Sequence, residues 1–171
     1  MIDPYIKLAK QTIKEYITKG VIIEPPKNLP KEMFTRKAGV FVSLHKKEEL
    51  RGCIGTFLLT KENTAQEIIS NAISSATRDP RFAPIRPDEL KDLEISVDIL
   101  SEPEKIDSME QLDPKKYGVI VKTIDGRSGL LLPNIEGINH PHEQVAIACA
   151  KAGILPHEKI QLYRFTVERH K

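Results

Sequence analysis

Apolar residues recur at helical spacing in three segments of the chain, 4–19, 64–77 and 141–152. Asp3 precedes the first segment, where its side chain can accept hydrogen bonds from the free amides of the first helical turn. Gly20 follows that segment and suits the left-handed backbone that commonly ends a helix. We therefore predict three helices, each with one buried face.

Apolar and polar residues alternate in most of the remaining segments, as they do in strands with one buried face. The predicted strands are 38–45, 50–59, 93–99, 117–124, 127–132 and 163–167. The first two strands flank a charged turn, and the next-to-last pair flanks Asp125 and Gly126, a strong turn signal, so both pairs are expected to form hairpins. In the third strand the polar residues, Asp98 among them, are expected to face solvent.

Hairpins outnumber strand–helix–strand units in this order of elements. The pattern predicts an α+β fold, with a mainly antiparallel sheet and packed helices. The 171 residues suit a single domain, or two small lobes that share a core.

Composition narrows the functional classes. The 26 basic and 24 acidic residues are interleaved, only 5% of residues are aromatic, and there is no Trp, so a nucleic-acid partner is not expected. Two cysteines are too few for a disulfide framework, a Cys-rich zinc site or an iron–sulfur cluster, and no cofactor is predicted. Without a signal pattern or an apolar run of ~20 residues, the chain is expected to be cytoplasmic, with no membrane partner.

The strongest candidate for chemistry is the strand segment 50–57. It contains Gly52 and Gly55, which mark a bulge or a close approach to the backbone. Alternation places Arg51 and Cys53 on the same face, where the guanidinium would favour the thiolate. The alternative is structural, because cysteine often acts as a small buried hydrophobe and glycine can let a helix pack closely.

The expected hairpin register also bears on this segment. If residues 46–49 form the loop, Cys53 lies opposite Val42, and His45 points to the other face of the sheet. No general base for a cysteine–histidine pair would then be supplied locally.

A second candidate segment is Arg78-Asp79-Pro80-Arg81-Phe82, which follows a predicted helix. Together with Arg86, its arginines could bind an anion. The more common outcome for such arginines is a set of ion pairs with neighbouring acidic residues, which here are Asp79, Asp88 and Glu89.

At these two segments the sequence resembles the AMMECR-one domain family. Residues 50–57 match the family's signature octapeptide and 79–82 match its second motif, and segments 94–101 and 129–135 also look like the family's strands. The variant Leu-Pro-Asn at 132–134 is similar to that of bacterial members from the AmmeMemoRadiSam system, although many relatives have Gln after the proline.

The resemblance implies an α+β fold with two unequal lobes. The larger lobe would hold both termini, and the octapeptide would lie at a cleft between the lobes. It also implies Memo-type and radical-SAM proteins as partners, but no settled activity, so whether the protein is an enzyme stays open. The residues expected to bind a ligand are Arg51, Gly52, Cys53, Gly55, Thr56, Arg78, Asp79, Arg81 and Phe82.

Three functions remain open. The first is a module that binds or presents an anionic small molecule or an acidic segment of a partner. The second is a thiol-dependent enzyme with Cys53 as nucleophile and Arg51 as its electrostatic partner. The third is a structural or regulatory scaffold.

Two further groups of residues are not expected to carry chemistry. His140 and His142 flank Pro141, which is expected to begin a helix and turn the two imidazoles apart, so no metal site is predicted there. Cys149 falls on the apolar stripe of that helix and is expected to be a buried structural thiol.

Overall fold

The computed structural model describes all residues from 1 to 171. The chain divides into two compact units. Unit 1 comprises Met1–Leu100 and Glu168–Lys171, so it contains both chain ends, and unit 2 comprises Ser101–Val167. Each unit has its own four-stranded sheet and its own helices, which confirms the predicted α+β fold with antiparallel sheets. The predicted cleft between two lobes stays a prediction.

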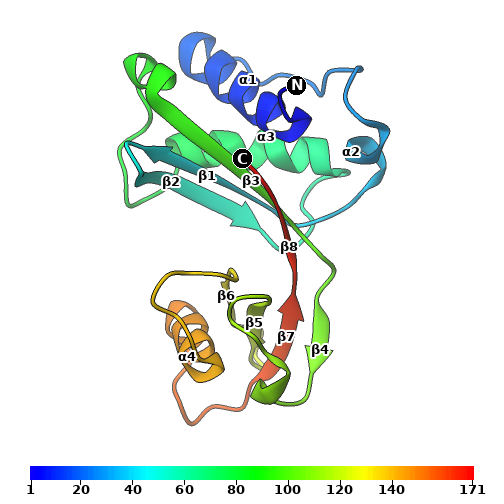
Figure 1. Ribbon diagram of the computed structural model, residues 1–171, viewed down its shortest axis with the longest axis vertical. Coiled ribbons are helices and arrows are strands. Elements are labelled where there is room, and N and C mark those ends of the chain that lie inside the picture. Colours follow the sequence, from blue (N-terminus) through cyan, green and yellow to red (C-terminus); the bar gives the residue numbers. More distant parts are fainter. The chain divides into compact units, whose positions relative to one another are not determined.

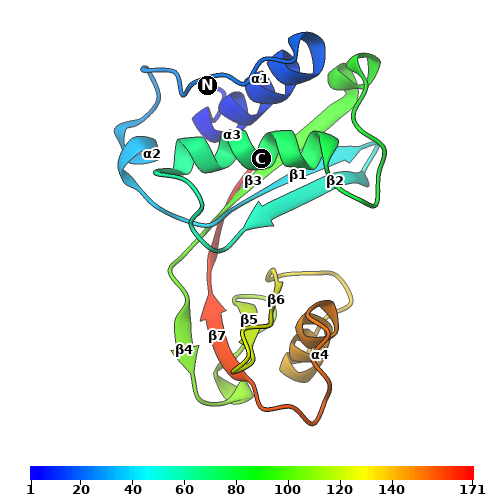
Figure 2. The ribbon, with the colours of Figure 1, turned by 180° about the vertical axis from the view of Figure 1, so that it is seen from behind.

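The sheet of unit 1 has the strand order β2-β1-β3-β8. Its strands are β1 (Val40–Lys46), β2 (Glu49–Thr56), β3 (Leu93–Leu100) and β8 (Val167–His170). The helical segments of unit 1 are α1 (Pro4–Lys19), α2 (Lys31–Thr35), α3 (Thr64–Thr77) and the 3-10 helix η1 (Pro87–Asp92). Helix α3 packs on β1 and β2, and α1 packs on α3 and β3, so the helices cover one face of this sheet (Figures 1 and 2).

Helix α1 follows its sequence signals closely. The Asp3 side chain accepts hydrogen bonds from the amides of Tyr5 and Ile6, at 2.8 and 3.3 Å. Gly20 ends the helix with φ of 68°. The apolar face of α1 is buried against α3 and the sheet, as predicted. The largest fully buried apolar side chains of the unit are Leu8, Ile13, Met33, Val40, Val42, Leu44, Ile68, Val97 and Ile99.

The β1–β2 hairpin is present, but its register differs from the prediction. Arg51 is the extra residue of a β-bulge, so Cys53 lies opposite Ser43 rather than Val42. Since alternate residues of a strand share a face, His45 lies on the same face as Ser43 and Cys53. The expectation that His45 points to the opposite face is therefore wrong, and the bulge is the physical reason.

Two other strand predictions also need correction. Asp98 is buried, with 1% of its surface exposed, because it forms an ion pair with Arg169 of β8. The predicted strand 163–167 is divided at Thr166, whose backbone amide donates a hydrogen bond to the Ser101 hydroxyl. The chain therefore leaves the sheet of unit 2 and continues as a strand of the unit 1 sheet.

Unit 2 has the strand order β4-β7-β5-β6. Its elements are β4 (Glu104–Ile106), the 3-10 helix η2 (Met109–Gln111), β5 (Gly118–Lys122), β6 (Ser128–Leu131), α4 (Pro141–Lys151) and β7 (Gln161–Phe165). The predicted hairpin turn is confirmed at Gly126, where φ is 89°. Helix α4 packs on β5 and β6, and a Cβ atom at Gly129 would lie 2.0 Å from the Ala148 carbonyl oxygen. Glycine therefore permits this close packing.

The histidines at the start of α4 do not turn apart. His140 and His142 are stacked, with ring centroids 5.5 Å apart and an interplanar angle of 12°. Because the helix begins at Pro141, His140 keeps an extended backbone, and its ring lies beside that of His142. No group of three or more His, Cys, Asp or Glu residues is placed to share a metal ion. None of the helices combines the length and apolar character that crossing a membrane requires.

Candidate functional site

The octapeptide strand β2 is held against helix α3 at Gly52. A Cβ atom at Gly52 would lie 2.3 Å from the Ser75 carbonyl oxygen, so a larger residue does not fit. The Ser75 hydroxyl donates to the Val42 carbonyl at 2.7 Å and accepts from the Ile54 amide at 2.8 Å. Gly52 therefore has the structural role that the sequence left open, and Cys53 faces the other side of the sheet.

The end of the octapeptide is fixed by buried polar contacts. The Thr56 hydroxyl donates to Glu67 at 2.9 Å and accepts from Asn71 at 3.1 Å. Glu67 is fully buried and also accepts hydrogen bonds from the backbone amides of Thr60 and Lys61. Because these bonds satisfy a buried carboxylate, Thr56 helps to hold the strand to α3.

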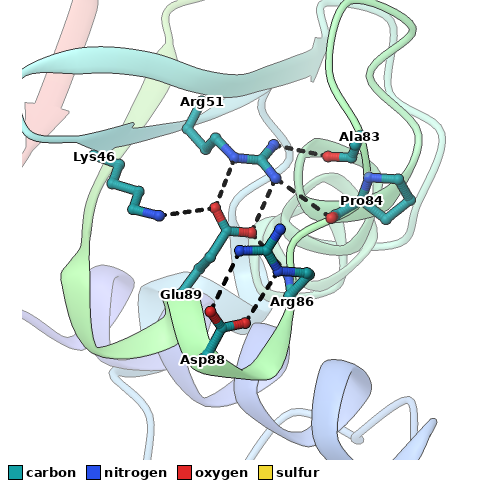
Figure 3. Close-up of polar contacts among 7 residues, drawn as sticks. All are labelled: Lys46, Arg51, Ala83, Pro84, Arg86, Asp88 and Glu89. Carbon is teal, nitrogen blue, oxygen red and sulfur yellow. Dashed lines mark hydrogen bonds and ion pairs between the residues drawn. The ribbon is translucent and has the colours of Figure 1, made fainter.

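The Arg51 side chain binds residues of the segment 83–89 (Figure 3). Its Nε and Nη2 atoms donate to the Glu89 carboxylate at 3.2 and 3.0 Å, and its Nη1 atom donates to the Ala83 carbonyl at 2.7 Å. Lys46 adds a bond of 3.1 Å to Glu89. Several hydrogen bonds, those from Arg51 contributing most, lower the pKa of Glu89 from 4.5 to about 2. Arg51 therefore anchors the loop after α3 to the hairpin.

Asp79 binds both the backbone of Cys53 and the side chain of Arg81. Its carboxylate accepts from the Cys53 amide at 3.0 Å, and from Nε and Nη2 of Arg81 at 3.0 and 2.8 Å. These bonds, led by those from Arg81, hold the pKa of Asp79 well below its usual value. The Arg81 guanidinium also lies 5.4 Å from the ring centroid of Phe82. Asp79, Arg81 and Phe82 are therefore brought together beside Cys53, as the sequence motifs suggested.

The Cys53 thiol is in a setting that favours its neutral form. Burial raises its pKa, which the nearby Ser43 hydroxyl and the Arg81 charge only partly oppose. The Ser43 Oγ atom lies 3.2 Å from the sulfur. The expectation that Arg51 would favour a thiolate is wrong, because the bulge directs Arg51 to Glu89.

A second arginine–aspartate pair lies on the same sheet. Nε and Nη2 of Arg169 donate to the two Asp98 carboxylate oxygens, each at 2.7 Å, and this raises the pKa of Arg169. Asp98 is also among the charges that raise the Cys53 pKa, and Cys53 contributes to the raised pKa of Arg169. This pair could not be predicted from the sequence, because it forms only when β8 joins the sheet. The alternating pattern of β3 gave no signal that distinguished Asp98 from the other polar residues of the strand, Glu94 and Ser96.

The two arginine–aspartate pairs have the same arrangement. The Asp79 and Asp98 side chains are each 2% exposed, whereas those of Arg81 and Arg169 are 56% and 37% exposed. Each arginine uses Nε and Nη2 for its partner, and neither Nη1 atom has a hydrogen bond within the chain. Each buried carboxylate therefore fixes a guanidinium whose outer edge remains available.

The remaining arginines and Gly55 differ in their surroundings. Phe41 covers Gly55, since a Cβ atom there would lie 2.2 Å from its ring. Arg78 is exposed, without an ion pair, and lines a separate groove of about 340 Å³ beside α3. Arg86 forms an exposed pair with Asp88. The arginine-rich segment is thus divided between an internal pair at Arg81, an exposed pair at Arg86 and an unpaired side chain at Arg78.

Comparison with known proteins identifies the family of this chain. The model of the family described as AMMECR1 matches residues 6–170, nearly the whole chain. The chain belongs to the AMMECR1 family. The resemblance of the octapeptide and the second motif to this family is therefore confirmed.

Relatives of this AMMECR1 chain come from bacteria and archaea. A Thermotoga maritima protein is 54% identical over 171 residues, covering 98% of this chain and 97% of the relative. A Clostridium acetobutylicum protein is 51% identical across 99% of this chain, which spans only 36% of that longer protein. The crystal structure of an uncharacterized Pyrococcus horikoshii protein matches with a TM-score of 0.86 at 36% identity, covering 96% of this chain and 88% of that one. The AMMECR1 fold is thus shared.

Proposed function

We propose that this AMMECR1 chain is a binding module that holds an anionic group, a carboxylate or a phosphate, beside Cys53. The observation that carries this proposal is the pair of fixed guanidiniums. Arg81 and Arg169 are each held by a buried carboxylate and keep an unbonded Nη1 atom at an exposed edge. Arginine presents donors in a planar fork that suits carboxylate and phosphate oxygens.

Fixation of the two side chains favours binding. An arginine that is already ordered loses less conformational entropy when a ligand binds than a mobile lysine or arginine does. The residues between the two pairs are small and polar. Cys53 lies opposite Ser43, and Ser43 lies opposite Ser96 on the next strand, with all three side chains half-buried. The two serines of this row carry hydroxyl groups that can donate hydrogen bonds to an anion.

The same geometry gives less support to a thiol-dependent enzyme. A nucleophilic cysteine is activated by a lowered pKa or by an adjacent base. At Cys53, burial raises the pKa, and Arg51 bonds to Glu89 instead. His45 shares the face of Cys53, but no hydrogen bond joins the two side chains. We therefore favour Cys53 as a contact residue of the site, with Arg51, Gly52, Gly55 and Thr56 as its frame.

The partner proteins rest on the family resemblance alone. We propose that Memo-type and radical-SAM proteins use the bound group, with this chain presenting it to them. Co-expression followed by size-exclusion chromatography tests this part separately. Co-elution of this chain with either protein supports it, and separate elution of all three at micromolar concentrations contradicts it.

Thermal unfolding in the presence of inorganic phosphate tests the binding proposal. A ligand at ten times its Kd stabilises the folded protein by about 1.4 kcal/mol, which corresponds to a rise in Tm of about 3–5 °C. Sodium chloride at the same ionic strength is the control for general salt effects. Acetate and oxalate distinguish a carboxylate preference from a phosphate preference.

The variants Arg81→Lys and Arg169→Lys keep the positive charge but remove the outer Nη1 donor. Each is expected to abolish most of the phosphate-dependent rise in Tm. Arg86→Lys is the matched control, because Arg86 uses the same two nitrogens to bind Asp88 but does so away from Cys53. If Arg86→Lys removes the effect as fully as the other two variants, or if no anion raises the Tm of the wild-type protein, the proposal is wrong.

A further inference from the structure

A second site of different character lies between α1 and the start of β3. It is a groove of about 200 Å³. Its lining residues are Lys10, Ile13 and Lys14 from α1, Leu90 and Lys91 from η1, and Leu93 and Ile95 from β3. Ile95 pairs with Leu44, whose side chain is in the core under the helices, so the groove lies on the helix-covered side of the sheet. It is therefore separate from the face that carries Cys53.

The walls of this groove are basic. Lys10 and Lys14 project from α1, and Lys91 stands in the last turn of η1 on the opposite wall. All three side chains are exposed, and none makes an ion pair or a hydrogen bond within the chain. No acidic residue lines the groove. Lys7 extends the stripe along α1 by one further turn, since residues three and seven positions apart share a helix face.

The floor of the groove is apolar. Ile13 is buried, and Leu90, Leu93 and Ile95 are half-buried. A volume of about 200 Å³ is below the roughly 300–1,000 Å³ of sites that enclose a whole small-molecule ligand. It suits one or two aliphatic side chains. The groove therefore combines a small apolar floor with walls of unpaired lysines.

We infer that this groove docks an acidic segment of a partner protein, in which an apolar anchor side chain is flanked by Asp or Glu residues. The anchor fills the apolar floor, and carboxylates on both sides of it meet the lysines of the two walls. A fatty acid has one carboxylate and would leave the lysines of one wall without a partner. A nucleic acid has phosphates but no aliphatic group to fill the floor.

Fluorescence anisotropy with a defined peptide tests this inference. The probe is a short fluorescein-labelled peptide with a central Leu-Leu pair and glutamates on both sides. The wild-type protein is expected to bind it saturably, with an affinity that falls as salt rises. A peptide in which Ser replaces both leucines is expected to bind on the order of tenfold more weakly, because it cannot fill the floor.

Matched charge reversals test the walls. The triple variant Lys10→Glu, Lys14→Glu and Lys91→Glu is expected to weaken binding at least about tenfold. The control triple Lys27→Glu, Lys37→Glu and Lys159→Glu changes the net charge equally at exposed, unpaired lysines elsewhere, and is expected to change binding less than about twofold. Circular dichroism checks the fold of both variants.

Three results overturn the inference. One is the absence of saturable binding to the wild-type protein. Another is an equal loss of affinity in the two triple variants, which indicates a general effect of net charge. The last is equal binding of the serine peptide, which indicates a polyanion surface without an apolar anchor. The two peptides need no change in the protein, so this comparison stands even if a variant fails to fold.

Discussion

Replacement of Arg51 by alanine should destabilise the protein in a way that depends on pH. Arg51 supplies two of the hydrogen bonds to the Glu89 carboxylate, which has a side chain that is 6% exposed. A shift of the Glu89 pKa from 4.5 to about 2 corresponds to about 3 kcal/mol of stability at neutral pH. Lys46 and the Arg86 amide remain in the variant. We therefore expect Arg51→Ala to cost about 2 kcal/mol at pH 7.

The sign of the pH dependence follows from the direction of this shift. Because the pKa of Glu89 is lower in the folded protein than in the unfolded chain, the stabilisation is fully present above about pH 4.5. It is lost as the pH falls toward 2. The difference in unfolding free energy between wild type and Arg51→Ala should thus shrink from about 2 kcal/mol at pH 7 to slightly more than about 1 kcal/mol at pH 3.

Urea unfolding followed by far-ultraviolet circular dichroism measures this difference at both pH values. Arg86→Ala is the control, because Arg86 belongs to the same group of residues (Figure 3) but forms an exposed pair with Asp88, and little change is expected. A cost for Arg51→Ala that is the same at pH 7 and pH 3 would refute the electrostatic reasoning. So would a cost no larger than that of Arg86→Ala.

The remaining predictions concern Gly52 and Glu67, which hold the octapeptide strand against α3, and the ion pair between Asp98 and Arg169. Gly52→Ala brings a Cβ atom to 2.3 Å from the Ser75 carbonyl oxygen and should cost about 2–3 kcal/mol by urea unfolding, whereas an unchanged midpoint would contradict the close packing of α3. Glu67→Ala leaves buried donors without an acceptor and should cost about 3 kcal/mol by the same measurement; a cost below 1 kcal/mol would show that water replaces the carboxylate. Asp98→Asn should lower both the Tm and the phosphate response, since Arg169 loses its bidentate partner, and an unchanged phosphate response would separate this pair from the site.

Much of the fold could be predicted from local signals. Helix α1 begins after Asp3 and ends before Gly20, because a capping carboxylate and a left-handed glycine act within a few residues of the helix ends. The hairpin at Gly126 was predictable for the same reason. The predictions that were wrong concern residues whose partners are distant in the sequence. The bulge at Arg51 brings its side chain to the segment 83–89, and Thr166, where the strand breaks, contacts Ser101, so in both cases the partner is far away in the sequence.

In the candidate site, too, local motifs could be read from the sequence, whereas distant partners could not. The motifs drew attention to Cys53, Asp79 and Arg81, which the structure joins by hydrogen bonds. The partner of Arg51 was not predictable, because alternation in an ideal strand takes no account of a bulge. The pair of Asp98 and Arg169 joins residues 71 positions apart, and the strand pattern alone placed Asp98 on the exposed face.

The pH dependence of Cys53 alkylation, measured by mass spectrometry with and without phosphate, tests the central claim most directly. Cys149, whose pKa is also raised by burial, is the internal reference. The account predicts a midpoint for Cys53 above the ~8.5 of an unperturbed thiol, and slower alkylation of Cys53 but not of Cys149 when phosphate replaces chloride at equal ionic strength. A midpoint below that value, with no protection by phosphate, would contradict the account and favour a reactive thiolate.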